Sequence, residues 1–185
     1  LPAHAALPKI PTAFSVDGRF LLVQMNEVAL WDLHTKALLA KIPGLQCHQL
    51  VLLKQDGWLL CVGQEVTIYD WRNQAAVSTI PSEGSNTFEL LAYSRETDRL
   101  IFRHGNEAVS VWQIGKKFSP LKHIALEASK DVPSLAASPD ARTLAIAGGH
   151  NIQLHDLIGM SIRDVAIPEG KPRDLLFSPN GLTLA

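Results

Sequence analysis

A short segment ending in a Trp-Asp-like pair recurs four times along this chain, and this repeat constrains the fold more than any other feature. The four segments are Leu30–Asp32, Ile68–Asp70, Val111–Gln113 and Leu154–Asp156. Their central residues stand at positions 31, 69, 112 and 155, so successive segments are 38, 43 and 43 residues apart. Self-similarity at a nearly fixed spacing is typical of a chain built from copies of one supersecondary unit.

A second marker follows the same period. Turn-forming tetrapeptides occur once per unit, at Ser15–Gly18, Lys54–Gly57, Arg95–Asp98, Ser138–Ala141 and Ser178–Gly181. Several of them contain Asp-Gly or Asn-Gly, pairs that supply the positive φ angle of a tight hairpin turn. Two markers in one phase, at a period of about 40–45 residues with four strands per unit, predict an all-β chain of β-propeller blades.

Each unit contains strand-sized segments rich in β-forming residues and separated by Gly, Pro, Asn and Asp. The strands predicted for the first two units are Thr12–Ser15, Phe20–Gln24, Val28–Asp32, Leu38–Ile42, Gln49–Lys54, Trp58–Val62, Val66–Asp70 and Ala76–Ile80. Those of the next two units are Phe88–Ser94, Arg99–His104, Ala108–Ile114, Leu121–Leu126, Pro133–Ser138, Thr143–Ala147, Ile152–Leu157 and Ser161–Ile167. A fifth unit starts with a strand at Asp174–Ser178 and a second strand at Leu182. We therefore predict four-stranded antiparallel blades along the chain.

On these turns and strand ends, the chain resembles the WD40-repeat family of β-propellers over nearly its whole length. Two features of that family are missing. The Gly-His pair that precedes each first strand is absent, and Cys47-His48 stands at one of its positions. The aspartate common between the second and third strands is also absent. We therefore do not expect the family's buried Asp-His-Ser/Thr-Trp hydrogen-bond network, and apolar packing and backbone ladders would hold each blade together.

The resemblance also implies a blade number. The blades fall at about residues 11–44, 48–82, 87–128 and 132–169, with an incomplete blade at 171–185. Propellers of this family usually close with seven blades, which need roughly 280–300 residues at this repeat length. We therefore expect about four and a half blades of a seven-bladed ring, with the remaining blades supplied by the same parent protein. A small closed ring and two self-complementing copies stay open as alternatives.

Composition is that of an ordinary globular protein, and it narrows the range of partners. The 185 residues are 46% hydrophobic and 19% charged, with a formal net charge of −1 at pH 7. A net charge this close to zero offers no broad basic surface for nucleic acid or an anionic membrane. No apolar run is long enough to span a bilayer. We expect neither a nucleic-acid partner nor a membrane span.

The two cysteines bear on the compartment. Cys61 lies within the predicted strand Trp58–Val62, and Cys47 precedes the strand expected to pair with it. Pairing around the intervening turn would place Cys61 opposite a residue near Leu52, so we predict two unpaired thiols. Unpaired thiols favour a reducing, cytoplasmic compartment, and a processed secreted or periplasmic chain is the alternative.

Patterns that could carry catalysis or bind a metal are weak. His150 and His155 are five residues apart, but one falls in a predicted turn and the other takes the Trp position of a strand, where packing is expected. No Gly-x-Ser-x-Gly elbow is present. Gly148-Gly149-His150 lacks the Lys-Ser/Thr and the helix of a phosphate loop. We therefore predict no catalytic residue, no metal site and no cofactor.

The repeated strand-end residues have a structural interpretation. Asp32, Asp70 and Asp156 end third strands, where a carboxylate can bond the amides of the following turn. We expect this role for them and not that of paired catalytic carboxylates. The aromatic residues that precede this position are expected to pack between blades: Trp31, Tyr69 and Trp112.

The resemblance implies a non-catalytic scaffold for protein–protein interaction, because propellers of this family are rigid platforms with variable loops. Their usual binding face carries the loops between fourth and first strands and between second and third strands. In this chain those loops contain His48, Glu83, Asn86, His104, Asn106, Lys130, Asp131, His150, Lys171 and Arg173. This mixed polar set suits a protein or peptide partner. The alternative is a regulatory or sensing module of a larger protein whose enzymatic domain lies outside this chain.

Overall fold

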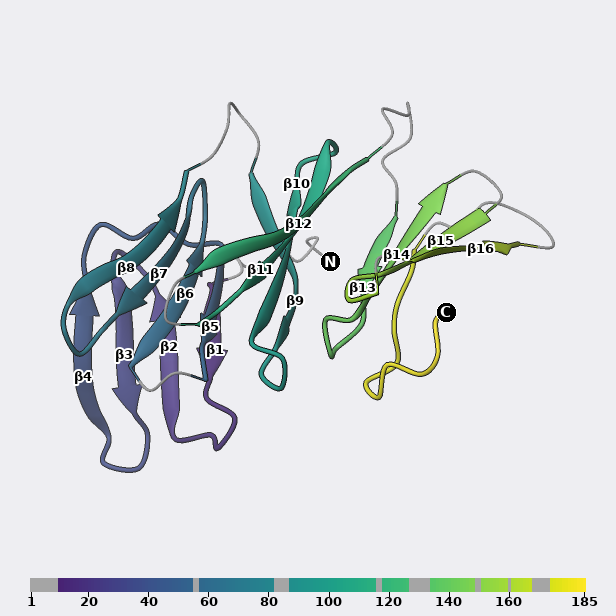
Figure 1. Cartoon of the computed structure of the whole chain (residues 1–185). Coiled ribbons are helices and arrows are strands. Elements are labelled where there is room, and N and C mark those ends of the chain that lie inside the picture. The colour runs from purple at the N-terminus through teal and green to yellow at the C-terminus, as the bar shows by residue number, and fades with distance from the viewer. Residues whose placement is uncertain are drawn as a thin grey trace, which may run out of the picture. The chain divides into compact units, whose positions relative to one another are not determined.

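A computed structural model of the chain describes residues 10–54, 57–81, 87–115, 118–126, 134–148, 151–159, 161–167 and 174–185. These residues form sixteen strands and no helix, and the strands make four antiparallel sheets (Figure 1). The prediction of an all-β chain with four-stranded antiparallel sheets is confirmed. The chain divides into two compact units, Leu1–Ser85 and Asn86–Ala185, and each unit holds two of the sheets.

The sheets follow one another along the sequence. In the first unit, sheet one contains β1 (Thr12–Phe14), β2 (Phe20–Gln24), β3 (Val28–Asp32) and β4 (Ala37–Ile42), and sheet two contains β5 (Gln49–Leu52), β6 (Trp58–Val62), β7 (Val66–Asp70) and β8 (Ala75–Ile80). In the second unit, sheet three contains β9 (Phe88–Ser94), β10 (Arg99–His104), β11 (Ala108–Gln113) and β12 (Ser119–Ala125), and sheet four contains β13 (Leu135–Ala137), β14 (Thr143–Gly148), β15 (Asn151–Asp156) and β16 (Ile162–Ala166). Strands are hydrogen-bonded in chain order, so every sheet is a simple meander.

Strand positions agree closely with the repeat. The second and third strands of sheet one, the second and third of sheet two, and the first and second of sheet three have the predicted bounds. β5 ends at Leu52, two residues before its predicted end, and β13 is limited to Leu135–Ala137. In the fifth unit, the two predicted strands reduce to a single bridge between Phe177 and Leu184. The turn residues therefore predict where each strand lies. The exact ends of a strand depend on how many backbone hydrogen bonds form with its neighbour.

One face of sheet one is buried against sheet two. Leu22 of β2 and Leu30 of β3 are fully buried and belong to one cluster with Leu50, Leu52 and Leu59 of sheet two. Leu22 and Leu30 lie opposite each other in the β2–β3 ladder, and Leu52 and Leu59 do so in the β5–β6 ladder. Because side chains alternate between the two faces of a strand, each pair comes from a single face of its sheet.

The second unit repeats this packing at corresponding positions. Ile101 and Val111 of sheet three are paired as Leu22 and Leu30 are, and both are fully buried. The facing pair in sheet four is Ala137 and Leu144, which corresponds to Leu52 and Leu59. In both units, a residue pair from the second and third strands of one sheet therefore packs against a pair from the first and second strands of the next sheet.

The C-terminal residues pack against sheet four through corresponding positions. Phe177 and Leu184, joined by the single bridge of the fifth unit, pack against a cluster that includes Ala136 and Ala145 of sheet four. Ala136 and Ala145 are opposite each other in the β13–β14 ladder. Three contacts, one in the first unit and two in the second, therefore use the same two sets of repeat positions, so within each unit the repeat in sequence is also a repeat in packing.

The other face of sheet one is different. Phe14 and Trp31 lie on it and are 62% and 38% exposed. They correspond to Leu52 and Tyr69 of sheet two, which pack against the buried cluster of the first unit. The prediction that aromatic residues at this position pack between sheets therefore holds for Tyr69 and is wrong for Trp31, whose face of the sheet is exposed.

Candidate partner-binding surface

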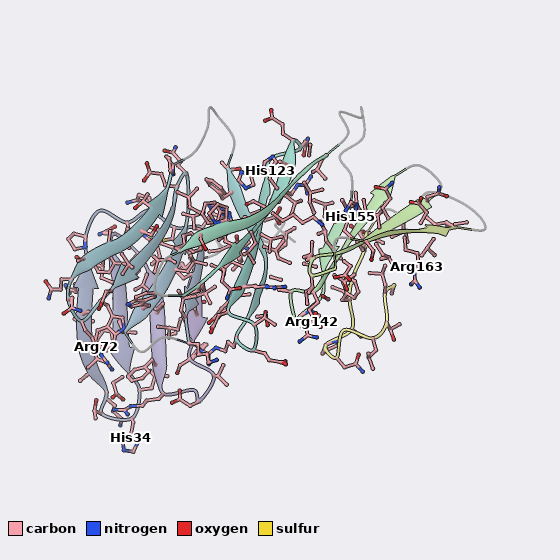
Figure 2. The ribbon with its side chains drawn as sticks, in the orientation of Figure 1. His34, Arg72, His123, Arg142, His155 and Arg163 are labelled. Atoms are coloured by element: carbon pink, nitrogen blue, oxygen red, sulfur yellow. A yellow bond between two sulfur atoms is a disulfide. The ribbon has the colours of Figure 1, made fainter. Side chains whose placement is uncertain are left out.

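The two ends of each sheet differ in chemistry. The turns after the first and third strands lie at one end, here named the capped end. The connection before the first strand and the turn after the second strand lie at the other, here named the loop end. His34 and Arg72 belong to the capped ends of sheets one and two and lie toward the same side of the first unit in Figure 2. By their sequence positions, all the predicted partner-binding residues belong to loop ends.

A carboxylate at the end of the third strand closes the capped end. Asp32 Oδ1 accepts the backbone N–H groups of His34 at 2.9 Å and of Thr35 at 3.1 Å. Asp70 and Asp156 accept the N–H groups two and three residues further along, at distances between 2.8 and 3.0 Å. The prediction that these aspartates bond turn amides is confirmed.

These contacts set the charge state of the three aspartates. The hydrogen bond from Arg19 is the main cause that lowers the pKa of Asp32 below its usual range. For Asp70 and Asp156, the main cause of the lowered pKa is a backbone N–H of the turn. Hydrogen bonds donated to an ionised carboxylate favour the ionised form. The three carboxylates are therefore charged and hydrogen-bonded at neutral pH, which suits a structural role and not proton transfer.

A serine closes the other turn of the capped end in three repeats. Ser15 Oγ accepts the N–H of Phe20 at 2.8 Å, and its hydroxyl donates to the carboxylate of Asp17. Ser138 and Ser178 accept the equivalent N–H, five residues further along, at 2.9 and 3.0 Å. The Ser-x-Asp-Gly-like tetrapeptides seen in the sequence are therefore hydrogen-bonded turns of one design.

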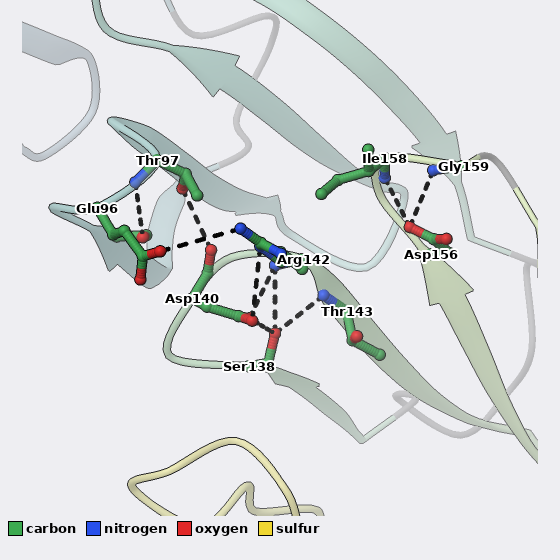
Figure 3. A network of polar contacts seen from close by, with 10 residues as sticks. Glu96, Thr97, Ser138, Asp140, Arg142, Thr143, Asp156, Ile158 and Gly159 are labelled. Carbon is green, nitrogen blue, oxygen red and sulfur yellow. Dashed lines mark hydrogen bonds and ion pairs between the residues drawn. The ribbon is translucent and has the colours of Figure 1, made fainter.

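In the second unit, a polar network joins the capped ends of sheets three and four (Figure 3). Thr97 Oγ1 donates to the carbonyl of Asp140 at 3.2 Å. The Arg142 guanidinium lies 4.0 Å from Glu96 and 3.8 Å from the Asp140 carboxylate. Side chains of Arg142 and Glu96 are 50% and 80% exposed, so their ion pair adds little stability. The polar side chains of this end are therefore in contact with one another across the two sheets.

The loop end of the first unit is built around Gln24, at the end of β2. This side chain is buried; its Nε2 donates to the Leu45 carbonyl and its Oε1 accepts the N–H of Cys47, both at 3.1 Å. Gly63, in the turn after β6, lies so close to the Gln46 carbonyl that a Cβ at residue 63 would collide with it. These contacts fix the chain leading into β5, and the side chain of His48 is exposed beside them.

Cys47 and Cys61 form a disulfide, so the prediction of two unpaired thiols is wrong. The register places Leu50 opposite Cys61, two residues from the expected Leu52. Cys47 lies before β5, outside the paired residues, and the chain brings its Cα within 5.3 Å of that of Cys61. Both cysteines are buried, at 9% and 3% exposure. The inference of a reducing compartment, which depended on free thiols, is withdrawn.

Arg103 organises the loop end of sheet three. Its Nε donates to the Gly105 carbonyl at 2.6 Å and its Nη2 donates to Asn106 Oδ1 at 2.9 Å. Its guanidinium also lies 4.0 Å from Glu89, and its side chain is only 16% exposed. Asn106 is therefore exposed on a turn whose backbone is held by a half-buried cation. One arginine before a turn is not a motif, so this role of Arg103 could not be predicted from the sequence.

His104 belongs to a second polar series in sheet three. Its Nε2 lies 2.5 Å from Ser110 Oγ, which also accepts the Nε1–H of Trp112 at 2.9 Å. The imidazole packs edge-on against Phe88, with 4.6 Å between ring centroids, and the Trp112 ring stacks on Phe118 at 4.7 Å. Ser110 is buried. These contacts link the side chains of β10 and β11. The positions 104, 110 and 112 match no known motif, so the series could not be predicted from the sequence.

Three of the ten predicted partner-binding residues lie in the part of the chain that the structure describes. His48, in the first unit, and Asn106, in the second, are exposed, and His104 is half-buried. The other seven lie outside the described residues: Glu83, Asn86, Lys130, Asp131, His150, Lys171 and Arg173.

His155, at the Trp position of β15, is buried with 6% of its surface exposed. Burial is the main cause that lowers its pKa, and the charge of Lys122 lowers the pKa further. A buried neutral imidazole suits the packing role predicted for it. Within the described ranges, which leave out His150, no three His, Cys, Asp or Glu side chains come together as a metal-binding group.

Comparison with known protein families and curated proteins identifies no relative from which a function could be inferred. No protein-family model matches the sequence, and no curated protein matches it. Among the described residues, no helix is long and apolar enough to cross a membrane. The repeat and the contrast between the two ends of the sheets are therefore the features of this chain that bear on its function.

Proposed function

We propose that this chain is a non-catalytic scaffold for protein–protein interaction and that its sheets are blades of a WD40-like β-propeller. The observation that carries the proposal is the repeated packing of corresponding positions, seen for Leu22 on Leu59 in the first unit and for Ile101 on Leu144 in the second. Sheets stacked through one repeated interface form a stiff body whose loops can vary without harm to the core.

The exposed face of sheet one supports the same proposal. Phe14 and Trp31 occupy positions that are covered in sheet two, where Leu52 and Tyr69 stand. We propose that a further blade of the parent protein covers this face in the way that sheet one covers sheet two.

The contrast between the sheet ends favours the loop ends as the binding surface. Asp32 and Ser15 show how the capped end uses its polar groups within the turns. At the loop ends, His48 and Asn106 are exposed on backbone held by Gln24 and Arg103. A backbone that is already ordered loses less entropy when a partner binds. A peptide or a protein loop with polar side chains is the partner that the loop end of either unit, taken by itself, would suit.

A peptide-display selection on the immobilised chain, followed by calorimetric titration of the selected peptides, tests the proposal. His48→Ala or Asn106→Ala is expected to weaken binding by about tenfold, the effect of losing one well-placed contact. His34→Ala is the matched control, because His34 is also exposed but lies at the capped end. Its substitution should leave the affinity unchanged. Failure to select any peptide, or affinities that ignore both loop-end substitutions, would overturn the proposal.

A further inference from the structure

We infer that the Cys47–Cys61 disulfide preorganises residues 45–48 for partner binding, so that binding at this loop end requires the oxidised chain. The inference rests on the function proposed above and adds a condition to it. The disulfide ties the residue directly before His48 to Cys61, the last residue but one of β6. His48 is the one predicted partner-binding residue of the first unit that lies within the described residues.

Three further restraints act on the same short segment. Gln24 bonds the residues on both sides of Gln46, at the Leu45 carbonyl and the Cys47 N–H. The Gln46 carbonyl itself is packed against Gly63. His48 donates its backbone N–H to the Val62 carbonyl at 2.8 Å.

These restraints differ in kind. The contacts of Gln24 and Gly63 depend on the position of the segment, whereas the disulfide is covalent and holds the segment where those contacts can form. Without it, the backbone of Cys47 is joined to β6 through weak contacts alone, since β5 begins only at Gln49. The register of β5 on β6 does not require the disulfide, so its loss should act on the segment and not on the sheet.

Reduction of the disulfide is a balanced two-electron step. A dithiol attacks one sulfur through its thiolate, the S–S bond breaks, and a second attack closes the dithiol into its own disulfide. Cys47 and Cys61 each end as a thiol and take up the two protons released by the dithiol. The two thiols separate to van der Waals distance, and the covalent restraint between Cys47 and β6 is gone.

Burial decides when this chemistry can happen. With exposures of 9% and 3%, the two cysteines are shielded from an attacking thiolate in the folded chain. The oxidation state is therefore set while the chain folds and then persists. Disulfides form and persist in oxidising compartments. We accordingly place the maturation of the binding-competent chain in such a compartment.

The first arm of the test needs no partner. Hydrogen exchange measured by mass spectrometry compares the oxidised chain with chain refolded in dithiothreitol and with the double variant Cys47→Ala/Cys61→Ala. The amides of Cys47 and His48 are expected to exchange at least about tenfold faster without the disulfide, because both are bonded only while the segment is in place. Amides in β2 and β3 should remain strongly protected relative to the unfolded chain, which shows that sheet one remains folded.

The second arm measures binding with a displayed peptide whose affinity falls on His48→Ala. Its affinity is expected to be about tenfold lower for chain refolded in dithiothreitol, and equally so for the double variant. Gly63→Ala should weaken binding even in the oxidised chain, because its Cβ displaces the Gln46 carbonyl. His34→Ala is the control, because His34 is exposed in the same unit but lies at the capped end.

The outcomes separate the two proposals. Unchanged exchange at Cys47 and His48 on reduction overturns the inference, whatever the binding result. Equal affinity in the oxidised and reduced chain also overturns it while the proposed function stands. If the oxidised chain selects no peptide that depends on loop-end residues, the proposed function fails, and the requirement for oxidation fails with it.

Discussion

Arg19 and Asp32 form an ion pair whose partners differ sharply in exposure. Arg19 Nη2 lies 2.8 Å from Asp32 Oδ2, and the two side chains are 52% and 3% exposed. Arg19 Nε donates to the same oxygen at 3.0 Å, while Oδ1 accepts the amides of His34 and Thr35. One carboxylate thus joins the two turns at the capped end of sheet one.

Asp32→Asn is expected to lower the urea midpoint at pH 7 and to change the pH dependence of stability. The pKa of Asp32 is lower in the folded chain than in the unfolded chain, where it is about 3.9. The ionised group therefore stabilises the fold above about pH 4, and this contribution disappears as the pH falls through the folded-state pKa. Urea titrations between about pH 7 and pH 2 should show a smaller acid loss for the variant than for the parent chain.

Glu65→Gln provides the control for this prediction. Glu65 is an exposed carboxylate in the turn after β6 of the same unit. Its substitution should leave both the midpoint and the acid profile close to those of the parent chain. An Asp32→Asn variant that lost stability in acid as steeply as the parent would show that the Arg19–Asp32 contact does not control the acid profile.

Lys36→Gly is expected to stabilise the chain. Lys36 stands four residues after Asp32 and has a φ of 56°, and Gln74 repeats this after Asp70 with a φ of 54°. A side chain in the left-handed region is strained, whereas glycine adopts it freely. Both positions are exposed, so Lys36→Gly or Gln74→Gly should raise the free energy of unfolding by about 0.5–1 kcal/mol.

A glycine placed in a strand should change the free energy of unfolding in the opposite direction, and chemical unfolding can compare the two variants. Ala76→Gly in β8, also exposed, should lower the free energy of unfolding by about 0.5–1 kcal/mol, because the strand loses backbone order and gains nothing. If Lys36→Gly were as destabilising as Ala76→Gly, the positive φ would not be a source of strain.

The repeat made most of the fold predictable. Asp17-Gly18 and Asn180-Gly181 mark turns whose positive φ glycine satisfies, and these turns recur in phase with the strand-end aspartates. Local signals of this kind fix strand positions because they depend on the backbone of a few neighbouring residues. Packing partners were less predictable: Tyr69 and Trp31 hold the same repeat position, yet one is covered by a sheet and the other is exposed.

The loop ends were harder to derive from sequence. Strand pairing around the turn was used to exclude a disulfide, but Cys47 lies outside the strand, where the path of the chain decides. Gln24 and Arg103 each act through a side chain that reaches a loop, at Cys47 and at Asn106. Single residues in such roles leave no pattern in one sequence, so structure was needed to find them.

Removal of the disulfide is expected to lower stability as well as to loosen residues 45–48. The bond joins cysteines 14 positions apart. A covalent loop of about 15 residues restricts the unfolded chain enough to stabilise the fold by about 3 kcal/mol. Cys47→Ala/Cys61→Ala should therefore unfold at lower denaturant by about that amount, and added dithiothreitol should not change the variant further. Equal stability of the parent chain and the variant, both without reductant, would contradict the bond's presence.

Ser110→Ala is expected to destabilise sheet three by about 1–3 kcal/mol, the range for leaving a buried hydrogen-bonding group without its partner. Ser110 is buried, and its hydroxyl is the acceptor for Trp112 Nε1–H and lies beside His104 Nε2. Ser119→Ala, at an exposed position of β12, is the matched control and should change stability by less than about 0.5 kcal/mol. Thermal unfolding of both variants measures these changes. Equal losses of stability for Ser110→Ala and Ser119→Ala would argue against the Trp112–Ser110–His104 series.

A pair of apolar truncations tests the proposed blade packing. Leu22→Ala removes a fully buried side chain between sheets one and two and should lower the free energy of unfolding by about 2–5 kcal/mol. Phe14→Ala, on the exposed face of sheet one, should change it by only about 0.5 kcal/mol in this chain.

The same two truncations should behave differently in the longer parent protein that the proposal requires. If a further blade covers the face that carries Phe14, that side chain becomes buried there as Leu52 is in this chain. Phe14→Ala should then lower the free energy of unfolding by about 3–5 kcal/mol in the parent, comparable with Leu22→Ala. A Phe14→Ala effect that stayed near 0.5 kcal/mol in the parent would mean that the face remains in solvent, because burial is what gives a core truncation its effect. The propeller arrangement would then have to be abandoned, while the four-stranded sheets and their capped ends would stand.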